Sequence, residues 1–113
     1  MSDATVYDLS GKRVYVAGHR GMVGGALLRR LEREGCAEIQ TATRDELDLT
    51  RQDQVERWMK ANRPEAVIVA AARVGGILAN DSFPAEFLYQ NLMIEANLTH
   101  TAAETGVEKL LFL

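Results

Sequence analysis

Three glycines at three-residue spacing form the part of this sequence best suited to holding a phosphate. Gly18, Gly21 and Gly24 lie within the stretch VAGHRGMVGG, between an apolar β-branched segment and a segment with helical periodicity. In such a turn the first glycine permits a tight bend, the second lets backbone N–H groups approach a pyrophosphate, and the third allows the helix to pack closely. The beginning of a helix also attracts anions through its dipole. The stretch therefore predicts a dinucleotide-binding turn.

The charges that follow the second expected strand bear on which dinucleotide would bind. A site for NAD usually has an acidic residue there, about twenty residues past the glycines, to hold the ribose hydroxyls. This sequence has Arg44 at that place, in the stretch TRDELDL, and Arg20 stands inside the glycine turn. A guanidinium can hold the 2′-phosphate of NADP bidentately, so two arginines favour NADP. Two alternatives stay open: Asp45 would suit NAD, and Arg44 could pair with Asp45 or Glu46 on a solvated turn.

Strands and helices that alternate along the chain must position these side chains. Short β-branched or apolar runs predict strands, and apolar residues at helical spacing predict helices. Thr50 is the expected N-cap of the second helix, which ends before Pro64. Val55, Trp58 and Met59 form its apolar face. The expected strands are 13–17, 38–42, 66–72 and 108–113; the other expected helices are 21–33 and about 84–105.

This alternation predicts an α/β fold with a doubly wound parallel sheet of the Rossmann type. Strands that are joined by helices run parallel with right-handed crossovers, and helices cover both faces of the sheet. We expect the first four strands of such a sheet, in the order 3-2-1-4. Residues 1–113 form one dinucleotide-binding domain in this interpretation, truncated after the fourth strand and without a substrate domain.

The composition excludes several other classes of protein. Thirteen basic and sixteen acidic residues are interspersed and give a net charge of −3, which argues against a nucleic-acid groove. The single cysteine, Cys36, excludes an intramolecular disulfide and a zinc site built on cysteines, and we expect no metal. The first residues do not resemble a secretory signal, and no apolar run is long enough to span a bilayer. We therefore expect a cytoplasmic protein that binds neither nucleic acid nor membrane.

A few other residues are weaker candidates for the site. Asp48 and Leu49 follow the second strand, where an adenine would lie, although Asp48 could equally be a turn residue. Asn91 lies among apolar residues of the long helix, and a structural role is favoured because a polar amide there needs partners. His19 could line the pyrophosphate, although a histidine in a loop is more often exposed, and His100 is expected on the surface of the long helix.

Several longer stretches carry a resemblance to a known family. These are VYVAGHRGMVGGALLRRLE, TRDELDL, AARVGGILAND with PAEFLYQNLMIEANLTHTA, and VEKLLFL. Together they resemble the N-terminal part of the GDP-L-fucose synthase family, within the extended short-chain dehydrogenases/reductases. Those enzymes are NADPH-dependent and epimerise and reduce GDP-4-keto-6-deoxy-D-mannose. The resemblance begins at about Lys12 and covers nearly all of the chain after it.

The resemblance implies a role for each matching position. Residues 18–24 would bind the pyrophosphate of NADP, Arg44 to Leu49 would border its adenosine, and the alanines that end the third strand would lie along the nicotinamide-side ribose. Residues 74–76 would lie beside the reacting sugar, and Arg73 replaces a common lysine. The helix 84–105 would build a homodimer. The implied cofactor residues are Gly18, His19, Arg20, Gly21, Met22, Val23, Gly24, Arg44, Asp45, Glu46, Leu47, Asp48, Leu49, Ala70, Ala71 and Ala72.

The sequence departs from this family in its chemistry. The family reduces its substrate with a tyrosine in a Tyr-x-x-x-Lys motif and a nearby serine, and epimerises it with a cysteine and a histidine. Tyr7, Tyr15 and Tyr89 are not followed by lysine four residues later, and Cys36 lies in the wrong segment. We therefore expect no catalytic residue here and an inactive, self-associating chain. The alternatives are a stand-alone NADP-binding or dimerising module, or part of an NAD-dependent nucleotide-sugar epimerase or dehydratase.

Overall fold

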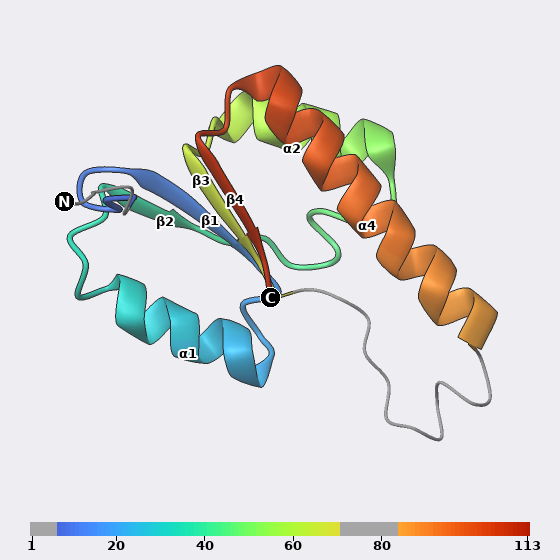
Figure 1. The fold of residues 1–113 in the computed structure, drawn as a ribbon, viewed down its shortest axis with the longest axis horizontal. Helices are drawn as coiled ribbons and strands as arrows, with labels where there is room; N and C mark the ends of the chain where they lie inside the picture. The colour runs from blue at the N-terminus through green and yellow to red at the C-terminus, as the bar shows by residue number, and fades with distance from the viewer. Residues whose placement is uncertain (1–6, 71–83) are drawn as a thin grey trace, which may run out of the picture.

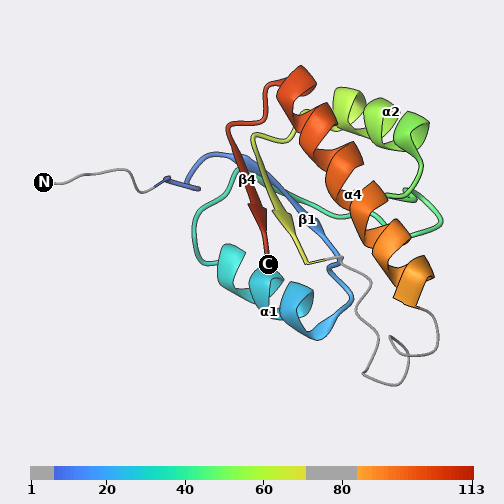
Figure 2. The same cartoon turned by 45° about the vertical axis from the view of Figure 1, so that its right-hand side comes forward.

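A computed structural model describes residues 7–70 and 84–113, which form a parallel sheet between two layers of helix. Figure 1 shows α1 on one face of the sheet and α2 with α4 on the other, and Figure 2 shows the same layers from a second direction. The elements are β1 (Arg13–Ala17), α1 (Met22–Leu31), β2 (Glu38–Gln40), α2 (Gln52–Asn62), β3 (Ala66–Val69), α4 (Pro84–Thr105) and β4 (Lys109–Phe112).

The two central strands, β1 and β3, supply most of the core because both of their faces are covered. Successive side chains of a strand point to opposite faces. Tyr15 therefore packs in the cluster beneath α2 and α4, whereas Val14 and Val16 pack beneath α1. All four residues of β3 are buried. Such continuous apolar runs are typical of parallel strands that are covered on both sides.

The doubly wound parallel fold predicted from the sequence is confirmed, but the strand order is β2-β1-β3-β4 rather than 3-2-1-4. The third strand pairs directly with the first, with Val16 opposite Ile68, and with β4 on its other side. The reason is burial: the outer place beside β2 would leave the apolar β3 at an edge. The residues that follow β2 form turns and not a further strand.

The element boundaries agree with expectation in most places. The long helix has its predicted limits, 84–105. The second strand is shorter than predicted, since it ends at Gln40, and the third ends at Val69. Thr50 is not the N-cap of α2; Arg51 occupies that position, and the Thr50 hydroxyl donates a hydrogen bond to Asp48 instead. Among the described residues, no helix is long and apolar enough to cross a membrane.

Candidate functional site

The glycine turn between β1 and α1 owes its shape to two glycines. Gly18 has a φ of 87°, in the left-handed region that other residues adopt at a cost, and its carbonyl accepts a hydrogen bond from the Gly21 N–H at 3.1 Å. Gly24 is buried against the same turn. A Cβ on Gly24 would collide with the Gly18 carbonyl and lie 2.8 Å from the Cα of His19. The helix can therefore begin this close to β1 only without a side chain at residue 24.

The first turn of α1 has the features of an anion site. Its N-cap is Gly21, no described side chain caps it, and it contains no acidic residue. Met22 is 92% exposed and Val23 is 54% exposed, so neither side chain covers the turn. The leading N–H groups of a helix have no partner within the helix and carry the positive end of its dipole. These observations fit a pyrophosphate, as the glycine spacing predicts.

The loop between β2 and α2 begins with a single helical turn that side chains stabilise. The Thr43 N–H donates to Glu46 Oε1 at 2.7 Å, and the Glu46 N–H donates to Thr43 Oγ1 at 3.3 Å. This reciprocal pair has the pattern of a capping box. The hydrogen bond from the Thr43 N–H holds the pKa of Glu46 below its usual value, with the charges of Arg20 and His19 adding to the effect. The Glu46 carboxylate is therefore already engaged.

The second part of this loop turns around Asp48. Its Oδ1 accepts hydrogen bonds from the Thr50 hydroxyl at 2.7 Å and from the Thr50 N–H at 3.0 Å. These bonds lower the pKa of Asp48, and the nearby charges of Arg44 and Arg51 lower it further. Asp48 is thus a turn residue, which was one of the two interpretations of its position in the sequence.

Two buried contacts fix this loop to the body of the domain. Leu47 is buried in the core cluster beneath α2 and α4. Asn97 of α4 is 4% exposed, and its Nδ2 donates to the carbonyl oxygen of Leu49 at 2.9 Å. A carbonyl that is partly shielded from water is stabilised by such a partner. The amide of Asn97 therefore determines how far residues 47–49 lie from α4.

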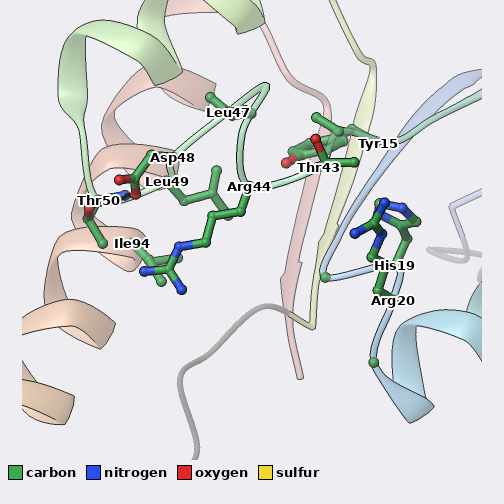
Figure 3. Close-up of a pocket in the computed structure, with 13 residues that line it drawn as sticks. Tyr15, His19, Arg20, Thr43, Arg44, Leu47, Asp48, Leu49, Thr50 and Ile94 are labelled. Carbon is green, nitrogen blue, oxygen red and sulfur yellow. Dashed lines mark hydrogen bonds between the residues drawn. The ribbon is translucent and has the colours of Figure 1, made fainter.

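A pocket of about 240 Å³ lies between the glycine turn, the Arg44 loop and α4. It is smaller than most complete ligand sites, which occupy about 300–1,000 Å³, so it suits one part of a larger ligand. Figure 3 shows its lining side chains, which come from β1, both loops and α4. The lining residues are Tyr15, Gly18, His19, Arg20, Gly21, Ala42, Thr43, Arg44, Leu47, Asp48, Leu49, Thr50 and Ile94.

The two arginines lie on different sides of this pocket. Arg44 extends from the second loop, and Arg20 lies with His19 on the opposite side (Figure 3). The electrostatic neighbours differ too: the charge of Arg44 acts on Asp48, and that of Arg20 acts on Glu46. The structure therefore brings both arginines to one pocket but does not show their guanidinium groups converging on one point.

Eight of the sixteen predicted cofactor residues line the pocket: Gly18, His19, Arg20, Gly21, Arg44, Leu47, Asp48 and Leu49. Gly24 does not line the pocket; it packs against the backbone of Gly18 and His19 and so supports the turn. Met22, Val23, Asp45, Glu46 and Ala70 do not line the pocket. Ala71 and Ala72 lie outside the described residues, as do Arg73 and residues 74–76.

Sequence reasoning did not assign Tyr15, Ala42, Thr43, Thr50 and Ile94 to the site, although all of them line the pocket. It also selected Asn91 as the notable amide of the long helix and overlooked Asn97. A signal for Asn97 was present. Asn97 falls on the helical stripe of Ile94, Leu98, Thr101 and Ala102, which is the buried face of α4. A polar amide on that stripe implies a buried partner.

The comparisons with known proteins agree with this geometry. The model of the NAD dependent epimerase/dehydratase family matches residues 14–113. The chain belongs to this family. The GDP-L-fucose synthase of Sinorhizobium fredii is 57% identical over 108 residues, which are 96% of this chain and 34% of that protein. The GDP-L-fucose synthase of Escherichia coli is 50% identical over 105 residues, 93% of this chain and 33% of that protein.

A solved structure extends the comparison to the fold. The GDP-mannoheptose C4 reductase from Campylobacter jejuni, with NADP bound, has a TM-score of 0.84 and 38% identity over 90% of this chain and 32% of its own. The resemblance noted in the sequence is confirmed by these relatives. The chain spans about a third of the length of the curated relatives it matches.

Proposed function

We propose that this chain is the cofactor-binding part of an NADPH-dependent enzyme that epimerises and reduces GDP-4-keto-6-deoxy-D-mannose to GDP-L-fucose. The observation that carries the proposal is the pocket that joins the glycine turn to the Arg44 loop. The names of the relatives at 57% and 50% identity support the GDP-sugar substrate. A structural relative that holds NADP supports the cofactor.

In this proposal the described residues bind and orient the cofactor. The N–H groups of the first turn of α1 would hold the pyrophosphate, beside Gly18 and Gly21. The apolar side chains of Leu47, Leu49 and Ile94 would enclose the adenosine. When bound, NADPH supplies the hydride for the reduction. No acid or base of the reaction is assigned to a described residue.

The charges in the second loop favour NADP over NAD. Arg44 lines the pocket, whereas Asp45, the acidic residue that would suit NAD, does not. The neighbouring carboxylate of Glu46 is held by the Thr43 N–H at 2.7 Å and is therefore engaged elsewhere. Asp48 also lines the pocket, but its Oδ1 accepts two hydrogen bonds from Thr50. Arg44 therefore suits a 2′-phosphate.

The proposal includes a homodimer formed through α4. Three large apolar side chains in the first half of this helix are exposed: Leu88 by 61%, Tyr89 by 62% and Leu92 by 54%. Leu92 lies four residues after Leu88 and three after Tyr89, so it neighbours both on the helix surface. An exposed apolar patch of this kind is typical of an interface. Sedimentation velocity should give the mass of a dimer for the chain and of a monomer for Leu92→Glu. A monomeric parent chain would contradict the dimer.

Calorimetric titration with NADP tests the central part of the proposal. Saturable binding to one site per chain is expected. Nicotinamide mononucleotide, which lacks the adenosine half, should bind far more weakly because the described pocket is the adenosine side of the site. The absence of NADP binding by a folded chain would contradict the proposed function.

A further inference from the structure

Tyr15 is a large aromatic residue with a polar hydroxyl in the centre of the buried strand β1. Its side chain is 2% exposed and lies on the face of β1 that is covered by α2 and α4. The ring packs against Trp58, with centroids 4.4 Å apart and ring planes inclined by 44°. This contact restricts the ring and fixes the direction of its hydroxyl.

The hydroxyl of Tyr15 has no hydrogen-bond partner within residues 7–70 and 84–113. Tyrosine hydroxyls that are buried in proteins usually have one, because an unpaired polar group loses its contacts with water. A phenol keeps its proton at neutral pH, and burial raises the pKa of Tyr15 further. Tyr7 shows the ordinary arrangement, since its hydroxyl donates to Glu108 Oε1 at 2.7 Å.

The location of this hydroxyl separates it from other unpaired groups. Among the described residues, the Thr101 hydroxyl and Gln40 Oε1 are buried without a partner, but neither residue lines a described pocket. Tyr15 lines the 240 Å³ pocket, where Figure 3 shows it beside Thr43. The other walls there include the apolar side chains of Leu47, Leu49 and Ile94. A flat heterocycle fits such walls, and its polar edge would need a partner within them.

We infer that the Tyr15 hydroxyl binds the adenine base of the dinucleotide by a hydrogen bond. This inference rests on the proposed function and adds a residue that the glycine and arginine patterns do not include. A tyrosine hydroxyl can both donate and accept, so it can pair with either kind of group on a purine edge. The ligand would thereby satisfy a polar group that residues 7–70 and 84–113 leave unpaired.

Tyr15→Phe tests this inference because it removes one oxygen and leaves the ring. Calorimetry with NADP, and separately with adenosine 2′,5′-bisphosphate, should show Kd raised by roughly three- to tenfold for both ligands, the range expected for one neutral hydrogen bond. The melting temperature of the free chain should stay the same or rise, since the lost hydroxyl has no partner in the described part of the chain. The matched control is Tyr7→Phe, which should leave both Kd values unchanged.

The outcomes separate the inference from the proposed function. Parent chain that does not bind NADP overturns both. If the parent chain binds NADP and Tyr15→Phe has the same Kd, the inference alone is overturned and the proposed function stays intact. A fall in the melting temperature of free Tyr15→Phe would show that the hydroxyl has a structural partner, and this also overturns the inference.

Discussion

The two loops that border the pocket are built in different ways. The turn between β1 and α1 depends on backbone, through the positive φ of Gly18 and the close approach of Gly24. The loop between β2 and α2 depends on side chains, through the Thr43–Glu46 pair and the amide of Asn97. In the backbone-built turn there is no room for a side-chain atom at residue 24. A site made from side chains can lose one contact at a time, so it can change its selectivity without losing the fold.

The largest expected effect follows from adding a methyl group to the backbone-built loop. Gly24→Ala would place a Cβ against the backbone of Gly18 and His19, which cannot move aside as a flexible side chain would. Overpacking usually destabilises by about 1–3 kcal/mol, and a backbone collision belongs at or beyond the upper end of that range. Urea unfolding should therefore show a loss of about 3 kcal/mol or more, together with lost NADP binding.

The adjacent glycine provides the matched control for this comparison. A Cβ on Gly25 would meet no atom closer than 3.8 Å. Gly25→Ala should be neutral or more stable, because alanine is favoured over glycine in a helix by about 1 kcal/mol. Equal destabilisation by both substitutions would show that the close approach of Gly24 does not determine the turn.

A smaller effect is expected from removing one contact of the side-chain-built loop. Asn97→Ala leaves the Leu49 carbonyl without its donor at 2.9 Å. The bond is only partly buried, so its loss should cost about 1 kcal/mol, and the chain should still fold. Hydrogen exchange should be faster at the amides of residues 43–50, and NADP should bind more weakly.

Asn62→Ala distinguishes a local effect from general destabilisation. Asn62 Nδ2 also donates to a backbone carbonyl, that of Trp58 at 2.8 Å, but it lies at the end of α2 and does not line the pocket. Asn62→Ala should reduce the free energy of unfolding without changing hydrogen exchange at residues 43–50 or the Kd for NADP. If Asn97→Ala behaves in the same way, the amide of Asn97 does not position the loop.

The same contrast explains which parts of the site could be predicted from the sequence. Glycines are informative because few other residues permit a positive φ or a close backbone approach, so their spacing predicts the turn and the helix that follows it. The apolar runs likewise predict parallel strands between helices. The turn residues of the second loop could not be assigned in this way. Thr43 and Thr50 are both plausible caps by type; in the structure Thr43 forms the reciprocal pair with Glu46, whereas the Thr50 hydroxyl donates to Asp48.

The strand order and the role of Asn97 could not be predicted from the sequence because both depend on long-range packing. β3 lies beside β1 because both of its faces are buried there. Its apolar sequence indicates this burial, but the strand order 3-2-1-4 that is typical of Rossmann folds places the third strand elsewhere. The choice between Asn91 and Asn97 depends on which face of α4 meets the sheet. Leu88 and Leu92 lie near Asn91 in the sequence but are exposed, so the apolar residues around it did not mark the buried face.

The most direct test of this account is the ratio of Kd for NAD to Kd for NADP in the parent chain and in Arg44→Ala. A charge-assisted hydrogen bond contributes about 1.5–3 kcal/mol, so NADP should bind the parent chain about 10- to 100-fold more tightly than NAD does. Arg44→Ala should reduce the ratio to near one and leave the Kd for NAD unchanged, because the backbone-built turn is intact. Arg51→Ala, in an exposed residue at the start of α2, should preserve the ratio. Equal affinity of the parent chain for NAD and NADP, or a ratio unaffected by Arg44→Ala, would contradict the account.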